Sequence, residues 1–343
     1  MKAGTPAAGS ETTRAAAPAL PEGEPARVAN ELVSDSEGAA LPAAQAAPTL
    51  PLAVARLPTP MFEALHQPRY YRQQIIRDVE AVTGRRLIVY FAAVLHSGSA
   101  ITASDVTPFQ DLLVDCPKGC DVDLLLQTPG GDIDAAEKLV YMLRERAKSM
   151  RVIVTDRAKS AGTLIALAAD SILMSATSEL GPIDPQVTLT QPDGKSLTRP
   201  AQSYLDGLEE IKQDVNKNDG QLNPAYFPLL NQLDPALLDY CKKASIRSRE
   251  FAEKWLRTFM LRNDAQKAKH IAQRLADVKT YGSHGMVIDH VEAEKLGLNI
   301  NHHDVDSPLW IPLWKLHASY DMHCRMSAVA KIFESNRVSL SFS

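Results

Sequence analysis

The chain of 343 residues contains no apolar run long enough to cross a bilayer as a helix. Its longest apolar runs, residues 87–95 and 163–169, are far shorter than the roughly 20 residues that a membrane-spanning helix needs. The N-terminus also lacks the basic head, compact apolar stretch and small-residue cleavage site of a signal peptide, although its Ala, Ser, Thr and scattered Arg leave organelle targeting open. We therefore expect neither a membrane span nor a secretory leader.

Cysteine and concentrated charge are also scarce. The four cysteines are too few and too scattered for a disulfide framework, and Cys116 and Cys120 have no second pair of ligands at zinc-finger spacing. A net charge of −4, without a long basic or acidic run, lacks the electrostatic footprint of a nucleic-acid binder. These observations favour a reduced, cytoplasmic setting and argue against nucleic acid as a partner.

Cofactor motifs are missing as well. The chain has no G-x-G-x-x-G, so no dinucleotide site is predicted. The histidines His302, His303, His317 and His323 have no carboxylate or cysteine pattern around them, and we interpret them as surface residues rather than metal ligands. We expect neither a cofactor nor a bound metal.

Composition divides the chain into a tail and a folded part. Residues 1–58 are mostly Ala, Pro, Gly, Ser and Glu, and they bury too little apolar surface to offset the entropy of ordering, which predicts a disordered tail. Residues 61–84 show apolar side chains at helical spacing and end at Gly84, a suitable C-cap. This helix is expected to open the domain, which we place at 59–300.

Buried strands and amphipathic helices then alternate along the chain. The expected strands are 86–95, 122–128, 151–156 and 171–175, and the expected helices are 103–116, 133–148 and 160–170. Ser104 is the expected N-cap of the first of these helices. Repeated strand and helix units with short connections imply right-handed crossovers and a layered α/β fold.

The character of the sequence changes after this region. Residues 180–202 form a stretch rich in Pro, Gly and Thr, for which we expect a loop. Amphipathic helical segments follow over about 203–278, which we interpret as a mainly helical insertion packed on the sheet or projecting toward another subunit. Residues 301–343 are assigned to a C-terminal extension.

Two strand-to-helix turns carry residues suited to chemistry. Gly130 and Gly131 follow one strand, where the main chain takes positive φ angles easily and the next helix offers free N–H donors. Ser160 begins the next helix at a turn with small neighbours, a pattern typical of a nucleophile whose following amide, here that of Ala161, completes an oxyanion hole. Each turn alone has a simpler explanation: a tight turn for the glycines, and an N-cap for Ser160.

The two turns together are more informative than either alone. They belong to adjacent strand–helix units, so both helix N-termini lie at the carboxyl edge of a parallel sheet. A substrate carbonyl between them would meet a serine and backbone donors from both turns. This arrangement predicts acyl transfer.

These residues resemble a known superfamily. The segments TPGGDIDAAEKL (128–139), AKSAGTLIALAAD (158–170), LGPIDPQ (180–186) and HGMVIDHVEAEKLGL (284–298) are similar to the ClpP and signal-peptide-peptidase serine proteases, and most similar to the serine dehydrogenase proteinase family. The resemblance is strong over 86–190 and moderate over 281–300. It implies the ClpP/crotonase-like layered fold of repeated βα units.

The resemblance also implies roles for individual residues. Ser160 corresponds to the nucleophile, and Gly130, Gly131 and Ala161 correspond to the oxyanion donors. ClpP-like members carry a histidine where this chain has Asp184, and His284 falls near the position of their aspartate. The serine dehydrogenase proteinase branch has the order Ser160, Asp184, His284, with the histidine as base. In the signal-peptide-peptidase branch the base is a lysine from a later helix; Lys212 is the nearest candidate, with Lys195 behind it.

Three functions remain open at this point. The first is a serine endopeptidase acting on peptides or unfolded protein. The second is a crotonase-like acyl-CoA enzyme that needs no serine nucleophile, and the third is a non-catalytic assembly scaffold. Proteases of this fold usually form rings, so we expect a homo-oligomer. Members of the branch often carry a membrane helix before the catalytic domain, whereas this chain has a Pro/Ala-rich tail, so membrane association is left open.

Overall fold

A computed structural model describes residues 60–190, 194–231, 233–277 and 281–343, with side chains described from residue 66 onward. The chain divides into two units, Met1–Leu57 and Pro58–Ser343, and the fold below is that of the second. The tail predicted over residues 1–58 lies outside the described residues.

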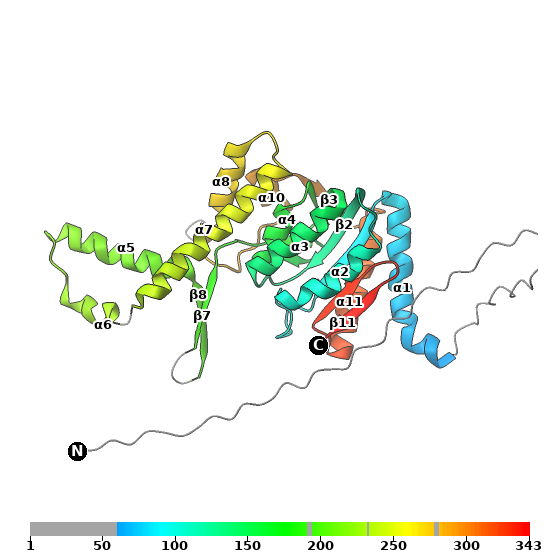
Figure 1. Ribbon diagram of the computed structural model, residues 1–343, viewed down its shortest axis with the longest axis horizontal. Helices are drawn as coiled ribbons and strands as arrows, with labels where there is room; N and C mark the ends of the chain where they lie inside the picture. The colour runs from blue at the N-terminus through cyan, green and yellow to red at the C-terminus, as the bar shows by residue number, and fades with distance from the viewer. Residues whose placement is uncertain (1–59, 191–193, 232, 278–280) are drawn as a thin grey trace, which may run out of the picture. The chain divides into compact units, whose positions relative to one another are not determined.

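Seven strands form one mostly parallel sheet in the order β11-β10-β1-β2-β3-β5-β9 (Figure 1). The first five strands of this sheet along the chain pair in parallel, and the last two pair antiparallel at one edge. The strands are β1 Arg86–Ala92, β2 Cys120–Gln127, β3 Ala147–Ile153, β5 Ser171–Met174, β9 Ile300–His302, β10 Lys331–Glu334 and β11 Ser339–Phe342.

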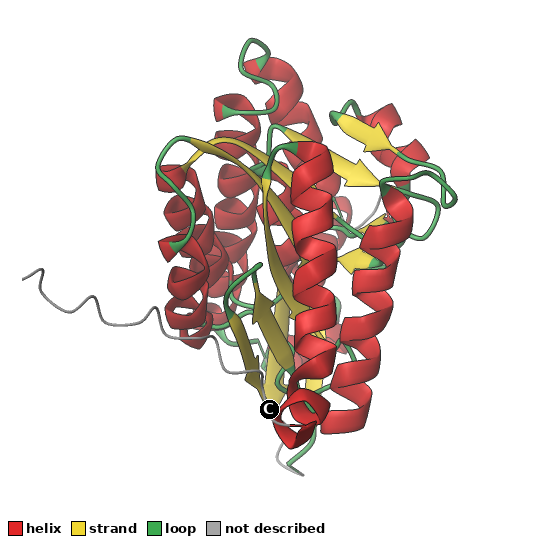
Figure 2. Cartoon of the chain, turned by 90° about the vertical axis from the view of Figure 1, so that its right-hand side faces the viewer, coloured by secondary structure: helices red, strands yellow, loops and turns green. Residues whose placement is uncertain are grey.

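Helices cover both faces of the sheet (Figure 2). One core joins the sheet to α1 and α11, and the other joins it to α2, α3, α4, α7 and α8. The helices are α1 Pro60–Thr83, η1 Ala103–Asp105, α2 Val106–Val114, α3 Ile133–Arg146, α4 Ala161–Leu167, α5 Ala201–Lys217, η2 Pro224–Tyr226, α6 Phe227–Leu230, α7 Pro235–Thr258, α8 Ala265–Leu275, α10 His290–Leu296 and α11 Trp310–Ser327.

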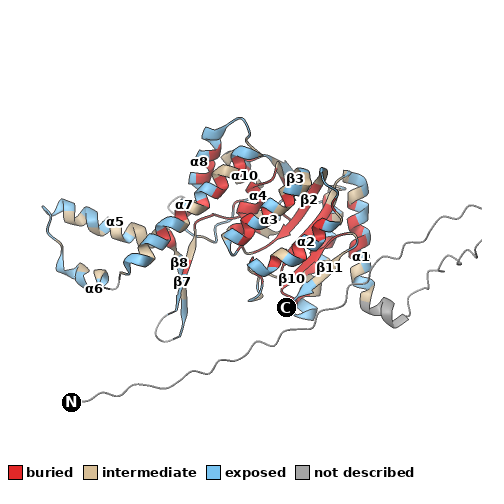
Figure 3. Cartoon of the chain, viewed as in Figure 1, coloured by how far each residue is buried: buried red, intermediate tan, exposed pale blue. Residues whose placement is uncertain are grey.

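Strand β1 is apolar along almost all of its length because both of its faces are buried. Leu87, Val89 and Phe91 contribute to the core with α1 and α11, whereas Ile88 and Tyr90 contribute to the opposite core. Both sets are buried, as the colouring of the central strands in Figure 3 shows. A parallel strand covered on both faces requires apolar side chains at every position. The layered α/β prediction is therefore confirmed.

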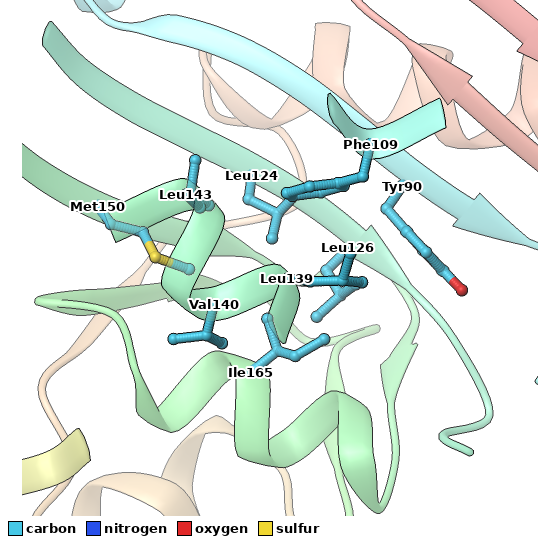
Figure 4. Close-up of a pocket in the computed structure, with 9 residues that line it drawn as sticks. All are labelled: Tyr90, Phe109, Leu124, Leu126, Leu139, Val140, Leu143, Met150 and Ile165. Carbon is cyan, nitrogen blue, oxygen red and sulfur yellow. The ribbon is translucent and has the colours of Figure 1, made fainter. Parts of the chain in front are cut away.

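The core on the second face is closely filled. Figure 4 shows side chains from β1, β2, α2, α3 and α4 converging there, including Tyr90, Phe109 and Ile165. They surround a void of only about 10 Å³, which is at the lower limit for one water molecule. This region is packing interior, and it supports the two turns at the edge of the sheet.

Some local expectations differ from the structure. Ser104 does not cap α2: η1 precedes that helix, and the Asp105 carboxylate accepts a hydrogen bond from Thr102 N at 2.9 Å. His317 is not a surface residue, because its ring is buried and its Nδ1 lies 2.9 Å from Thr155 Oγ1. The first difference comes from a short 3-10 turn and a hydrogen bond between near neighbours in the chain, and the second from a contact between residues far apart in the sequence.

The stretch expected to be a loop over 180–202 contains an antiparallel hairpin of β7 Gln186–Thr190 and β8 Ser196–Pro200. The alternating Val, Thr and Leu residues before Pro-Asp-Gly are the signal that predicts such a hairpin. The hairpin, α5 and α7 share a small core of Val187, Ala201 and Cys241. Helices α5 to α8 fall within the segment expected to be mainly helical.

Residues 301–343 contribute directly to the main architecture. They contain α11, β10 and β11, and β10 extends the sheet by pairing with β1, while β11 forms the edge beyond it. Trp310, Leu313 and Leu316 of α11 lie in the core on that face. Among the described residues, no helix combines the length and the apolar character needed to cross a membrane.

Candidate active site

Ser160 lies at a strained turn between β4 Arg157–Ala158 and α4. Its φ of 53° and ψ of −116° are values that glycine tolerates and other residues rarely adopt. The serine side chain makes no capping hydrogen bond to the helix, so the N-cap explanation does not hold. A strained non-glycine backbone costs about 1–3 kcal/mol and persists only where its surroundings enforce it, which is common at functional sites.

The Gly130–Gly131 turn approaches this serine closely. The φ angles of the two glycines are 103° and 148°, and a Cβ at Gly130 would lie 2.7 Å from Ser160 Cβ. Ile101 holds the turn from the other side, because its N–H donates to Gly130 O at 2.8 Å and its carbonyl accepts from Asp132 N at 2.9 Å. Glycine is required at this point both for the backbone angles and for the close contact.

The backbone amides at the two turns differ in availability. Gly130 N donates to Thr128 Oγ1 at 3.1 Å, so this amide is occupied, contrary to the prediction that Gly130 is an oxyanion donor. Within the described part of the chain, the amides of Gly131 and Ala161 have no hydrogen-bond acceptor. Ala161 is the first residue of α4, where an N–H has no partner inside the helix. One free donor therefore comes from each turn.

His284 and Asp184, separated by 100 positions, form a hydrogen-bonded pair. His284 Nδ1 lies 2.8 Å from Asp184 Oδ1, and the other carboxylate oxygen accepts from Gln186 Nε2 at 2.7 Å. The Asp184 side chain is only 2% exposed, whereas the His284 ring is 25% exposed. A buried carboxylate on Nδ1 orients the ring and leaves Nε2 for proton transfer.

His284, which is hydrogen-bonded to Asp184, lines the same pocket as Ser160. Ser160 and His284 are both in the wall of an open pocket of about 520 Å³, a size typical of ligand sites. Among the described residues, no hydrogen bond connects Ser160 Oγ to His284. Such bonds are often long without substrate and tighten in the complex.

Lys212 lies outside this pocket. It is on α5, its side chain is 60% exposed, and its ammonium is 3.8 Å from Glu209 Oε2 one turn earlier. Lys195, which precedes β8, does not line the pocket either. The structure thus brings Ser160, Asp184 and His284 together, with Gly131 and Ala161, and leaves both lysines apart.

One wall of the pocket comes from α7, in the helical segment, and was not expected. Tyr240, Ala244 and Ser248 line it from successive turns of this helix, and Ser248 Oγ donates to Ile183 O at 2.5 Å. Their spacing of four residues marks one face of the helix, a signal present in the sequence. No group of three or more His, Cys, Asp or Glu side chains suited to a metal occurs in the part of the chain that the structure describes.

Comparison with known proteins gives a family match and several relatives. The family model of the ClpP-like SDH-type serine proteinases matches residues 70–316. The uncharacterized protein MJ1495 of Methanocaldococcus jannaschii is 27% identical over 67% of this chain and 71% of its own length. A second uncharacterized protein of that organism, MJ0137, is 31% identical over 59% of this chain and 60% of its own length.

Two similar solved structures are variants of a protease described as 1510-N membrane-bound stomatin-specific protease. A serine-to-alanine mutant is 24% identical, covers 38% of this chain and 64% of its own, and has a TM-score of 0.26. A lysine-to-alanine mutant in complex with a substrate peptide is 15% identical, covers 69% of this chain and 98% of its own, and has a TM-score of 0.31.

Proposed function

Because the chain belongs to the ClpP-like SDH-type serine proteinase family, we propose that it hydrolyses peptide bonds by nucleophilic attack of Ser160. One observation carries this proposal: a strained serine shares its pocket with His284, which is hydrogen-bonded to Asp184, and with Gly131 and Ala161, whose amides have no acceptor among the described residues. Acyl transfer to a serine requires a nucleophilic hydroxyl, hydrogen-bond donors for the oxyanion and an oriented base, and each of these has a candidate here.

The proposed first step is acylation of the serine. Ser160 Oγ attacks the peptide carbonyl carbon, and His284 Nε2 takes the hydroxyl proton while Asp184 holds the ring by Nδ1. The negative charge on the carbonyl oxygen is stabilised by the amides of Gly131 and Ala161. The C–N bond then breaks, and His284 returns the proton to the leaving amine.

The second step is hydrolysis of the acyl-enzyme. Water replaces the amine, His284 takes one of its protons, and oxygen attacks the ester carbon at the same oxyanion site. Collapse of the intermediate releases the peptide acid and returns the proton to Ser160 Oγ. No step uses Lys212, whose ion pair with Glu209 lies on the exposed face of α5.

The substrate and assembly are part of the same proposal. The family implies peptide substrates, and we propose peptides or unfolded segments because the pocket is open and lies between the sheet edge and α7. Self-association is supported by large apolar side chains exposed on the segment after Asp184 and outside the pocket, among them Leu189, Phe227 and Leu229. A cytoplasmic location stays a prediction.

A fluorophosphonate probe tests the nucleophile. Ser160 Oγ displaces fluoride from phosphorus, so the folded protein should gain the adduct on Ser160, and Ser160→Ala should gain none. His284→Ala should slow labelling about 10²–10⁴-fold, the usual contribution of general-base catalysis. Absence of label on folded wild-type protein, with activity on a thioester retained in Ser160→Ala, would instead favour a crotonase-like enzyme.

A further inference from the structure

The residue before Ser160 has an unusual environment for a lysine. The Lys159 side chain is only 13% exposed. Its ammonium donates to Leu180 O and to Met286 O, both at 3.0 Å, and lies 3.3 Å from Glu179 Oε1. An ammonium has three N–H groups, and here each of them has an acceptor. Burial lowers the pKa of Lys159, and the neighbouring Glu179 opposes this effect.

The acceptors belong to the two chain segments that carry Asp184 and His284. Leu180 is four positions before Asp184, and Met286 is two positions after His284. These segments already meet at one point, because Leu180 N donates to Ile288 O at 2.9 Å and Ile288 N donates back at 3.1 Å. The ammonium of Lys159 adds a second connection, and this one reaches the turn that holds Ser160.

The path of the lysine stem is narrow. A Cβ at Gly181 would lie 2.6 Å from Lys159 Cδ, so the stem crosses directly over this glycine. Beneath it, β4 pairs in parallel with β6 Glu179–Leu180, which places Ala158 opposite Leu180. The side chain therefore has a defined route from the serine turn, across the Asp184 segment, to the His284 loop.

Lys159 does not contact the space in which a substrate would react. It is not in the wall of the pocket that Ser160 and His284 line. Within the described part of the chain, the ammonium of Lys159 is the only group that donates a hydrogen bond to Met286 O. Met286 is 47% exposed, so in a variant with an apolar group water would replace the ammonium at this carbonyl, but the loop between Gly282 and Val287 would lose that connection to the Ser160 turn.

Building on the proposed function, we propose that Lys159 is a positioning residue that fixes the His284 loop and the Asp184 segment against the Ser160 turn. The alignment of Ser160 Oγ with His284 Nε2 depends on three separate chain segments, and Lys159 is the side chain that bonds to the other two from the first. Small misplacements of reacting groups are costly, with losses of about 10²-fold for a shift near 1 Å.

The test compares Lys159→Met with Lys254→Met. Methionine keeps an unbranched stem and removes the ammonium. Lys254 is a matched control because its ammonium also joins two elements, α7 and α3, through Glu137 at 3.0 Å and the Tyr141 hydroxyl, but contacts neither the Asp184 nor the His284 segment. Lys159→Gln, which retains two N–H donors, serves as an intermediate variant.

Three measurements are made on each variant: the rate of fluorophosphonate labelling of Ser160, kcat and KM on a p-nitrophenyl ester, and hydrogen–deuterium exchange of residues 281–289. For Lys159→Met we expect labelling and kcat to fall about 10–100-fold while KM changes little, because the residue positions the base without touching substrate. Exchange in 281–289 should rise. Lys159→Gln should fall between, and Lys254→Met should match wild type.

The outcomes separate this inference from the proposed function. If wild type labels on Ser160 but Lys159→Met and Lys159→Gln keep its kcat and exchange rates, the inference is overturned and the peptidase proposal stands. If wild type does not label, both are overturned. Should Lys159→Met fail to fold, the result for Lys159→Gln decides: wild-type kcat in that variant overturns the inference, and a lowered kcat with unchanged KM supports it.

Discussion

The contact between the Gly-Gly turn and the serine turn gives a prediction whose size follows from the structure. A Cβ on Gly130 would lie 2.7 Å from both Lys159 O and Ser160 Cβ, and 3.2 Å from Ala161 N. Atoms do not approach a real Cβ this closely, so Gly130→Ala must push the two turns apart by several tenths of an ångström. Its φ of 103° adds backbone strain.

The expected cost has two parts. Placing alanine at positive φ costs about 1–2 kcal/mol, and overpacking against backbone and a buried turn costs a further 1–3 kcal/mol or so. Gly119→Ala isolates the first part, because Gly119 has a φ of 80° and nothing within 4 Å of its Cβ position. Effects of alanine on the unfolded chain are common to both variants and cancel in the difference.

Urea unfolding measures the loss of stability in Gly130→Ala, and fluorophosphonate labelling separately measures its loss of reactivity. Gly130→Ala should lose about 1–3 kcal/mol more unfolding free energy than Gly119→Ala. Displacing the turn also separates the amides of Gly131 and Ala161, so labelling should slow on the order of 10–100-fold, somewhat less than the loss of a whole oxyanion donor. Equal stability of the two variants, or wild-type labelling by Gly130→Ala, would refute the close approach and its role.

Two further predictions concern a lysine and a histidine outside the pocket. Lys212→Ala should label at the wild-type rate and change stability by less than about 1 kcal/mol, because Lys212 is exposed and its ion pair with Glu209 is loose; a large loss of labelling would restore it as the base. Burial lowers the pKa of His317 in the folded protein. Below the unfolded value near 6.5 the unfolded chain therefore binds a proton that the folded protein does not, so the unfolding free energy is greatest above this pH and decreases as the pH falls below it. Urea unfolding across this range should show a slope that His317→Gln reduces, and an unchanged slope would contradict the burial argument.

Local patterns were sufficient to predict the centre of the fold. The continuous apolar run at 86–95, and the strands and helices after it, were recognised because each is encoded by the side chains of its own segment. The two turns could also be placed at one edge, since parallel strands end on the same side of a sheet. Glycine at 130 and 131 and serine at 160 therefore pointed to the site before any tertiary contact was known.

The extension at 301–343 shows the limit of this reasoning. Strands β10 and β11 are short, with four residues each, and β10 finds its partner β1 more than 230 residues earlier in the chain. Short segments carry little periodicity, and the pairing of distant strands leaves no trace in either one alone. The hairpin β7–β8 was missed although its alternation and turn residues were visible.

The sequence by itself determined the strand and helix alternation, the two glycine- and serine-bearing turns and their common edge, because these depend on side chains that are neighbours in the chain. Only the tertiary structure decided that Gly130 N is bonded to Thr128 while the amides of Gly131 and Ala161 have no acceptor among the described residues, and that α7 forms a wall of the pocket. The family resemblance implied that His284 and Asp184 act together, but their hydrogen bond appears only in the structure, since a contact across 100 residues is set by how the whole chain packs.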